Sequence, residues 1–397
     1  MNAIQNKEMV RSAVLGTFVS DASAMGLHWI YSQGKISQIA KRHDGTVEFL
    51  EPDESNYQGV PAFFAHPHKE SGDSSNYGEY LYILLRALTE DGFDAGTYIR
   101  VFQEYFGIGG EYVGYADGPM RETIYNITTL GKEIEKRVQN AETKLAPDRK
   151  GIAAHYISRY FFEFDTEGLK ETIRAPLKLQ EFSKEELGYA DALVDEVSSI
   201  EKKIGPDDDQ MPALSRSAVL AHFYAGEELD RVVEESVRIT NDNEDAVAYS
   251  LFMARILRDL YESTRPEPKA VHETLRGLVE RHIDVLTEKG KEVVKQALQM
   301  DGLDHRGATK TFGAACHVHM AVPLVIHLLL NTGSFFEANR YNILSSGDTC
   351  GRSIMLGALA GVLYGVGGET GVPESWIDRC TIVEKSRATE GGKLLLG

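Results

Sequence analysis

The sequence predicts an all-α fold: a single compact multi-helix domain over residues 1–397, with a buried central helix near the C-terminus. Apolar residues recur at helical spacing along most of the chain, and the predicted helices follow one another with short connections, as in a helical bundle. No convincing run of alternating apolar and polar residues predicts strands. With 397 residues the chain could hold two domains, but one large helical domain is equally allowed.

The predicted central helix lies within Ser345 to Gly365. Ser345 to Gly347 predict a turn, and the side-chain oxygens of Asp348 and Thr349 can cap the backbone N–H groups that follow. From Ile354 onward nearly every position is apolar or small, so this helix is expected to be buried on all sides. Glycines recur every four residues, which lets another backbone come close, at 357, 361 and 365. The segment is either a capped core helix or, because a helix N-terminus favours anions, a place for chemistry.

The first predicted helix covers residues 7–33 and carries Asp21 and His28. A proline-, glycine- and histidine-containing loop follows over 46–76, and a loop of this length inside a domain is usually functional. The next helix is predicted from about Gly78 to Thr89, with Glu79 in its first turn. Residues 110–126 predict a glycine-containing loop that leads into a helix near Pro119, because proline is favoured in a first helical turn.

The middle of the chain predicts surface and core helices. Residues 127–205 are highly charged, and their aromatic residues, Tyr156 to Phe164, are interpreted as a packing cluster. Further helices are predicted over 214–225, 229–240, 246–261, 266–289, 290–300 and 320–330. Three adjacent aspartates at 207–209 favour a helix-initiating loop over a cation site. Cys316, His317 and His319 are close in sequence, but on a helix the two histidines would face different sides, so a structural role is favoured over zinc binding.

Charge and cysteine content exclude several classes of protein. The net charge of −18, with no cluster of lysine and arginine, argues against nucleic acid or an anionic membrane as the main partner and favours a small ligand or a protein. The three cysteines are too scattered for a disulfide framework, which indicates a reducing compartment. No secretory signal or membrane-spanning run is evident, so we expect a cytoplasmic protein. The sequence does not indicate the oligomeric state.

The segment S-S-G-D-T-C-G-R-S-I-M-L-G-A-L-A-G-V-L-Y-G resembles the signature of the ADP-ribosylglycohydrolase family, G-G-D-T-D-T followed by a small-residue helix. The resemblance extends to Leu15–Tyr31 near the start, to the middle helices from Gln210, and to Phe312–Asn342. Within the family, the A-M-G-L-H-W-I-Y ending of the first motif and the altered turn look like the branch that contains jellyfish J-class crystallins and selenoprotein J.

The resemblance implies hydrolysis of an ADP-ribosyl bond by a pair of magnesium ions, which carboxylates from T-D-D-T and G-D-T-D-T elements hold. Asp348 matches one metal ligand, whereas Tyr77, Gly78 and Cys350 stand where the family has aspartates, and His28 replaces a glutamate. Loss of these hard oxygen ligands predicts a degenerate magnesium site. The family also places a diphosphate or ribose cradle in the loop at 110–126, which implies substrate binding by Gly114, Tyr115, Gly118 and Arg121.

Three hypotheses on function follow. In the first, the protein is an altered hydrolase in which Asp21, His28, Glu79 and Asp348 do acid–base work around an ADP-ribose-like ligand. In the second, it is a non-catalytic, crystallin-like binding or structural protein. In the third, Cys350 has a thiol-dependent activity, because a helix N-terminus lowers the pKa of a thiol.

Overall fold

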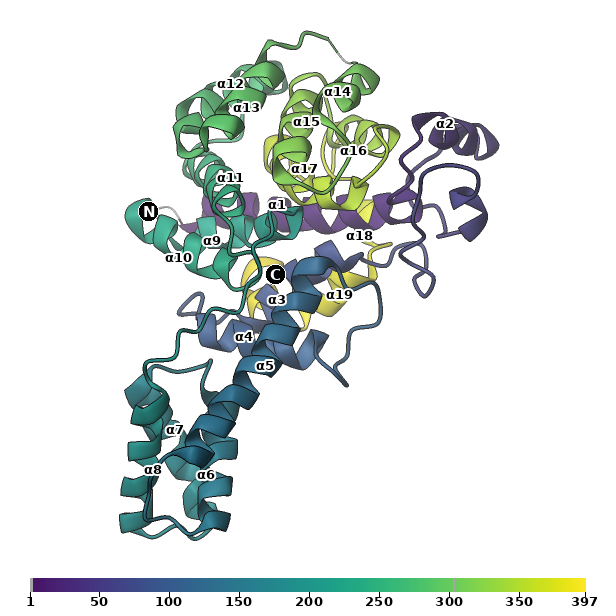
Figure 1. Cartoon of the computed structure of the whole chain (residues 1–397). Helices are drawn as coiled ribbons and strands as arrows, with labels where there is room; N and C mark the ends of the chain where they lie inside the picture. The colour runs from purple at the N-terminus through teal and green to yellow at the C-terminus, as the bar shows by residue number, and fades with distance from the viewer. Residues whose placement is uncertain (1–2, 303) are drawn as a thin grey trace.

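The centre of the molecule is a pair of helices from opposite ends of the chain, α1 (Ala3–Ala24) and α17 (Thr349–Tyr364) (Figure 1). Every residue of α17 is buried, as its composition predicts. The two backbones touch where glycines face each other: a Cβ on Gly16 would lie 2.2 Å from the carbonyl oxygen of Gly357, and one on Gly357 would lie 2.4 Å from the carbonyl oxygen of Gly16. The predicted close backbone approach is therefore confirmed at Gly357 and Gly361, whereas Gly365 faces the side chain of Arg265.

The computed structural model describes residues 3–302 and 304–397, and its regular elements are helices. In this part of the chain β-pairing is limited to isolated bridges, so the all-α prediction is confirmed. None of the helices described is long and apolar enough to cross a membrane. Around the central pair lie α2 (Gln33–Arg42), α3 (Asn76–Ala87), α4 (Ala95–Phe106), α9 (Ser217–Phe223), α10 (Gly226–Arg238), α11 (Glu244–Glu262), α12 (Val271–His282), α13 (Glu288–Gln299), α14 (His305–Phe312), α15 (Val318–Leu330), α16 (Phe335–Leu344), α18 (Glu374–Ile377), α19 (Thr381–Arg387) and α20 (Glu390–Leu395).

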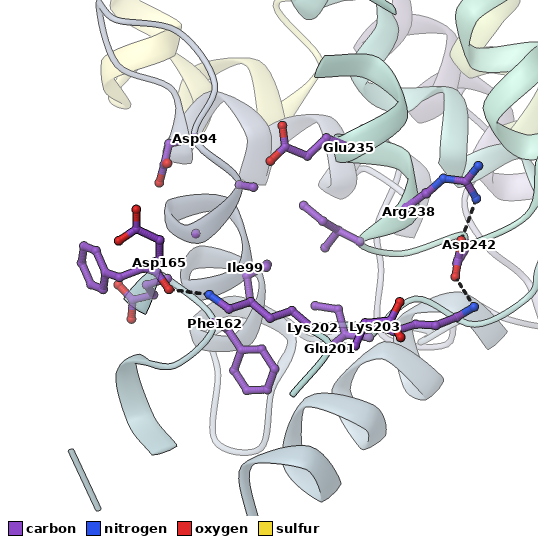
Figure 2. Close-up of a pocket in the computed structure, with 16 residues that line it drawn as sticks. Asp94, Ile99, Phe162, Asp165, Glu201, Lys202, Lys203, Glu235, Arg238 and Asp242 are labelled. Atoms are coloured by element: carbon purple, nitrogen blue, oxygen red, sulfur yellow. Dashed lines mark hydrogen bonds and ion pairs between the residues drawn. The ribbon is translucent and has the colours of Figure 1, made fainter. Parts of the chain in front are cut away.

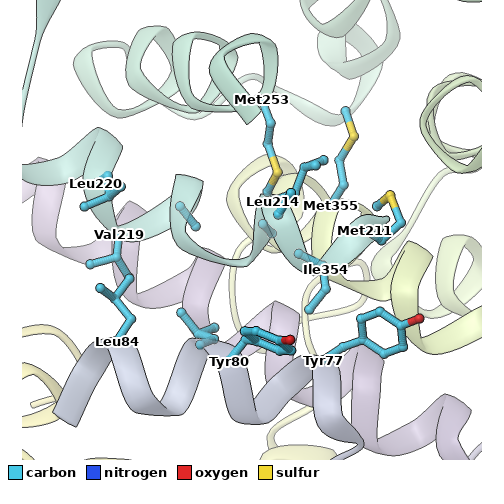
Figure 3. Packing of buried hydrophobic residues seen from close by; sticks show 14 of the residues in the cluster. Tyr77, Tyr80, Leu84, Met211, Leu214, Val219, Leu220, Met253, Ile354 and Met355 are labelled. Atoms are coloured by element: carbon cyan, nitrogen blue, oxygen red, sulfur yellow. The ribbon is translucent and has the colours of Figure 1, made fainter. Parts of the chain in front are cut away.

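One part of the core lies between α3, α17 and the short 3₁₀-helix over Met211–Arg216 (Figure 3). Tyr77 and Tyr80 of α3 are fully buried and face this layer, which Ile354 and Met355 of α17 complete. Full burial of an apolar side chain stabilises the fold by roughly 1.5–3 kcal/mol. The core therefore fixes the start of α3 and the start of α17 close to each other, and the candidate functional residues lie there.

Four helices form an arm that extends from this body (Figure 1), namely α5 (Gly118–Asn140), α6 (Pro147–Tyr160), α7 (Thr166–Leu179) and α8 (Lys184–Val197). The arm has its own apolar interior, which includes Ile157 and Ile173, and its charged residues lie mostly on the outside. The rings of Tyr156 and Tyr160 stack with centroids 6.5 Å apart, which agrees with the predicted packing cluster. That residues 1–397 form one domain stays a prediction.

Three predicted helices differ from the structure, and one of them, predicted over 266–289, is divided among two 3₁₀ turns, α12 and the start of α13. The helix predicted over 7–33 ends at Ala24, and a 3₁₀ turn over Met25–Leu27 follows it. Trp29 then takes a positive φ of 63°, which no α-helix accommodates. His28 therefore lies in a loop. Residues 214–225 are likewise divided between the 3₁₀-helix and α9.

Candidate functional site

A sharp turn before α17 brings two distant loops together. Gly347 has a φ of 69°, and a Cβ there would lie 2.2 Å from the carbonyl oxygen of Ala314, so only glycine fits. Its N–H donates to the carbonyl of Ile30 at 2.8 Å, and its own carbonyl accepts from the N–H of Trp29 at 2.9 Å. This pairing fixes the segment that carries His28 against the N-terminus of α17.

Asp348 and His28, both predicted from the sequence, are in direct contact. Oδ1 of Asp348 lies 2.8 Å from Nε2 of His28, and both side chains are fully buried. The same oxygen caps α17 by accepting from the N–H of Gly351 at 3.2 Å. Asp348 is therefore held as an acceptor for an imidazole N–H and a helix N-terminus.

His66 extends this contact into a chain of three side chains. Its Nε2 lies 2.8 Å from Nδ1 of His28, and the two rings stack with centroids 5.1 Å apart. Burial lowers the pKa of His66 well below 6.5, and the charges of His28 and Lys69 lower it further. The sequence analysis missed His66; the signal was its place in the long loop at 46–76, which had been predicted to be functional.

Aromatic rings cover this group. Trp29 packs on His28 with ring centroids 4.5 Å apart, and Tyr115 meets Trp29 edge-on at 4.9 Å. Phe63 contacts both Trp29 and Tyr115 and is 52% exposed, so it lies at the surface. We call the buried group the His28 cluster; it consists of His28, Trp29, His66, Tyr77 and Asp348.

Asp21 and Cys350 lie together beside this cluster. The carboxylate of Asp21 is fully buried, and it accepts hydrogen bonds from both hydroxyls of Ser74 and Ser75 and from the backbone N–H of Ser75. Burial raises the pKa of Asp21, although these hydrogen bonds oppose the rise. Sγ of Cys350 lies 3.6 Å from the carbonyl oxygen of Asp21.

The expected lowering of the Cys350 pKa is wrong. The thiol is fully buried, and burial raises its pKa well above 9.0; the charges of Asp21 and Asp348 raise it further. These effects outweigh the helix N-terminus, because the thiolate would lose its hydration and face two carboxylates. The contacts of Cys350 therefore favour a packing role over thiol chemistry.

Glu79 has partners of its own. Its carboxylate lies 3.3 Å from Nζ of Lys69 and accepts from the hydroxyl of Tyr105 at 2.7 Å. Lys69 belongs to the same loop as His66, so this buried ion pair ties the loop to α3. No hydrogen bond within the described part of the chain joins Glu79 to His28 or Asp348.

The loop at 110–126 contributes a buried acid that the sequence analysis missed. Asp117 is the N-cap of α5, accepting from the N–H of Met120 at 2.8 Å, and its carboxylate also accepts from Nδ2 of Asn76 at 2.7 Å and from the hydroxyl of Tyr80 at 3.0 Å. Burial raises the pKa of Asp117 to about 6. An aspartate directly before Gly118 and Pro119 is a typical N-cap pattern that could have identified it.

The predicted substrate-binding residues of this loop lie apart from one another. Tyr115 contacts the aromatic cover of the His28 cluster. Gly118 faces another loop, since a Cβ there would lie 3.7 Å from Oδ2 of Asp208. A Cβ on Gly114 would clash with the hydroxyl of Tyr112, and Arg121 is exposed and donates to the carbonyl of Ala116 within its own loop.

His317 and His319 differ from their prediction. His317 precedes α15 as its N-cap, so the two side chains do not face different sides of a helix. Both rings contact Asp209, through Nδ1 of His317 at 2.5 Å and Nδ1 of His319 at 3.3 Å, and they stack with centroids 5.7 Å apart. Asp209 thus joins the loop at 205–212 to the start of α15, which agrees with a structural role.

The residues around Asp348 do not fit a pair of magnesium ions. A side chain in place of Gly78 has no room, because a Cβ there would lie 2.6 Å from Oδ2 of Asp21. Tyr77 and Cys350 have no carboxylate, and the carboxylate of Asp348 is already hydrogen-bonded to His28. Across residues 3–302 and 304–397, no three His, Cys, Asp or Glu side chains are arranged to hold a metal.

A cavity of about 660 Å³ lies away from this site, between the arm and the body (Figure 2). Its lining carries charges of both signs, and several of them are paired: Asp242 binds Lys203 at 2.6 Å and Arg238 at 2.7 Å. Lys202 donates to the carbonyl of Phe164. This cavity contains none of the predicted site residues.

Comparisons with known proteins agree with the resemblance stated from the sequence. A family model described as ADP-ribosylglycohydrolase matches residues 2–391. Crystallin J1A and crystallin J1B of Tripedalia cystophora are 22% and 20% identical over 381 residues, which cover 96% of this chain and 94% of each relative. A solved structure described as an ADP-ribosylglycohydrolase-related protein complex superposes with a TM-score of 0.56 at 14% identity over 99% of this chain and 98% of that chain, which supports the fold. The chain therefore belongs to the ADP-ribosylglycohydrolase family.

Proposed function

We propose that this protein binds an ADP-ribose-like small molecule without magnesium and does not carry out metal-dependent hydrolysis of it. The contact between Asp348 and His28 supports this proposal most directly. The carboxylate that matches a family metal ligand points one oxygen at an imidazole 2.8 Å away. A magnesium ion demands several oxygen ligands in near-octahedral geometry, and this carboxylate offers it only one free oxygen.

The surroundings of the His28 cluster support a small ligand. Phe63 and Tyr31 are 52% and 40% exposed beside the buried cluster, and aromatic rings at the mouth of a site offer stacking surfaces for a nucleobase. The net charge of −18 disfavours nucleic acid as a partner. The cysteines described are all free, which supports a cytoplasmic location.

A structural role is the second candidate function. Two curated relatives that match nearly the whole chain are named crystallins. This chain also carries Tyr77, Gly78 and Cys350 where the resemblance places family aspartates. A structural protein of this kind needs only a stable fold and binds no ligand. Binding measurements separate the two candidates, because a purely structural protein gives no heat with any nucleotide.

Isothermal titration with ADP-ribose, once with Mg²⁺ and once with EDTA, tests the proposal. We expect the same affinity in both titrations and, in a separate assay with an ADP-ribosylated substrate, no release of ADP-ribose with either Mg²⁺ or EDTA. Asp348→Asn should weaken binding, because an amide is a poorer acceptor for the His28 N–H and disturbs the cluster. Asp73→Asn, which alters a half-buried carboxylate just before α3, is the matched control. Binding or turnover that requires Mg²⁺ would contradict the proposal, and the absence of heat in both titrations would favour the structural role.

A further inference from the structure

The cavity between the arm and the body is large enough for a small ligand (Figure 2). Its volume of about 660 Å³ lies within the range of roughly 300–1,000 Å³ that is typical of ligand pockets, which often lie where two structural units meet. The arm contributes the corner between α6 and α7, and the body contributes the start of α4 and the end of α10. None of the lining residues belongs to the His28 cluster, so this inference does not depend on the proposed function.

The buried part of the lining is apolar. Ile99 and Phe162 are each 6% exposed and come from the body and the arm respectively. Ile204 and Ile239 are also buried and complete this surface. Removal of methylene groups from water onto apolar side chains is favourable, so the lining suits a ligand with an aliphatic body.

The positive charges of the lining are already engaged. Arg238 forms ion pairs with three carboxylates, including that of Asp242 at 2.7 Å. Lys203 lies 2.6 Å from the same carboxylate, and Lys202 donates to the carbonyl of Phe164. A phosphate or carboxylate ligand would have to displace these partners. The cavity therefore does not suit an anion.

Three carboxylates of the lining form no ion pair within the described residues, namely those of Asp94, Asp165 and Glu201. Asp94 and Asp165 each use one oxygen to accept a backbone N–H at 2.7 Å, as the N-caps of α4 and α7. Asp165 and Lys202 attract each other, but the ammonium of Lys202 donates to a backbone carbonyl instead. Figure 2 shows Asp94 and Asp165 on the same side of the cavity. A carboxylate can accept several hydrogen bonds, so both can receive further donors.

We propose that this cavity binds an aliphatic polyamine. The ammonium groups contact the carboxylates of Asp94 and Asp165, and the methylene chain lies against Ile99 and Phe162. The net charge of −18 attracts such a cation to the protein, and the apolar lining favours it over a metal ion, which has no aliphatic body. Asp94 and Ile99 belong to the body, whereas Asp165 and Phe162 belong to the arm. A bound polyamine therefore joins the arm to the body.

Isothermal titration of the full chain with spermidine tests the proposal. Hexaamminecobalt(III), which has the same charge of +3 and no aliphatic chain, is the comparison probe. We expect one spermidine per chain and about tenfold weaker binding of the cobalt complex, because the complex cannot use the apolar lining. Equal affinities would overturn the proposal, because they would show attraction to the acidic surface alone. The absence of spermidine binding would overturn it as well.

Removal of the two unpaired charges adds a second measurement. Asp94→Asn/Asp165→Asn keeps both helix caps, because asparagine is as good an N-cap residue as aspartate. We expect this double variant to bind spermidine about fivefold more weakly, as for the loss of two exposed ion pairs. Glu133→Gln/Glu196→Gln is the matched control, since it removes two exposed carboxylates of the arm that do not line the cavity. The same loss in both double variants would assign binding to the overall charge and refute the site.

A block of the cavity without any change of charge locates the site. Ala95→Trp places an indole ring in the lining at the start of α4, and we expect it to abolish the binding of spermidine. Ala192→Trp, at an exposed position of α8, is the control and should bind as the wild type does. Circular dichroism confirms that both variants are folded. Undiminished binding by a folded Ala95→Trp protein would show that spermidine does not enter this cavity.

Discussion

The central helix pair and the His28 cluster are neighbours that are built in opposite ways. In the pair, α1 and α17 meet through bare backbone at Gly16 and Gly357, and α17 is a regular helix that is buried throughout. In the cluster, a few side chains from separate loops converge, Trp29 and Ser346 have positive φ values of 63° and 67°, and buried polar atoms lack partners. The helix pair therefore stabilises the fold. The strained backbone and the buried polar atoms without partners indicate a functional role for the cluster.

The largest change in the free energy of unfolding is expected from adding a methyl group between α1 and α17. Gly357→Ala should lower the free energy of unfolding by about 3 kcal/mol, at the upper end of the overpacking range, because the new Cβ would lie 2.4 Å from a backbone oxygen of Gly16. Urea denaturation measures this change. Gly131→Ala on α5 is the control: a Cβ there meets nothing within 4 Å, so stability should rise by roughly 0.5–1 kcal/mol. Equal effects at both sites would mean that the backbones do not touch.

A buried carboxyl beside the cluster should make stability depend on pH. Burial raises the pKa of Asp117 from 3.8 to about 6, so the folded state binds this proton more tightly than the unfolded state does. The contribution of Asp117 is therefore most favourable below pH 4 and is lost as the pH rises to about 6, by about 3 kcal/mol in total. Asp117→Asn should become more stable relative to the wild type by this amount between pH 4 and pH 7.

Urea denaturation at several pH values measures the effect of Asp117. Asp304→Asn, at the exposed N-cap of α14, is the matched control, because its carboxylate is in contact with water. A difference between wild type and Asp117→Asn that does not vary with pH would contradict the prediction.

The titration of His66 should change stability with pH in the opposite direction to that of Asp117. Burial lowers its pKa in the folded state, so the unfolded state takes up a proton first as the pH falls. The favourable contribution of neutral His66 is present above pH 6.5 and is lost below it by about 1.4 kcal/mol per pH unit, or about 2 kcal/mol between pH 6.5 and pH 5. His66→Gln should remove this loss, whereas His43→Gln should retain it. A wild-type protein whose acid sensitivity survives in His66→Gln would show that another group is responsible.

The smallest effect is expected from relief of backbone strain next to Asp348. Ser346 has a φ of 67°, so Ser346→Gly should raise the free energy of unfolding by about 0.5 kcal/mol, after subtracting the entropy that glycine adds to the unfolded chain. Ser345→Gly is the control, because Ser345 has an ordinary φ of −71° and should lose stability. A loss in both variants would show that the turn is not strained.

The sequence predicted the fold well because the fold follows from local patterns. A few helical turns of sequence are enough to recognise helical periodicity, the small-residue face of α17 and the cap at Asp348. The family resemblance identified His28 and Asp348 as candidate site residues, but the hydrogen bond between them is known only from the structure. That resemblance is confirmed over the whole chain, whereas the roles proposed for Asp21, Glu79 and the loop residues stay predictions.

The rest of the site could not be predicted, because it depends on contacts between distant residues. His66 meets His28 across 38 positions, and Asp117 meets Asn76 across 41. Nothing near these residues in sequence indicates the partner. For Cys350, the local rule for helix N-termini gave the wrong direction of pKa shift, since burial depends on α1, which packs from the other end of the chain.

The pairing of α1 with α17 also constrains how the protein is made. The hydroxyl of Thr17 lies 3.4 Å from the carbonyl oxygen of Ile354, 337 positions later. When the ribosome has synthesised the chain up to α16, the apolar α1 has already emerged, but α17, the helix against which it packs, has not yet been made. Such a nascent chain exposes this apolar surface until the last helices emerge, and an exposed apolar surface favours aggregation.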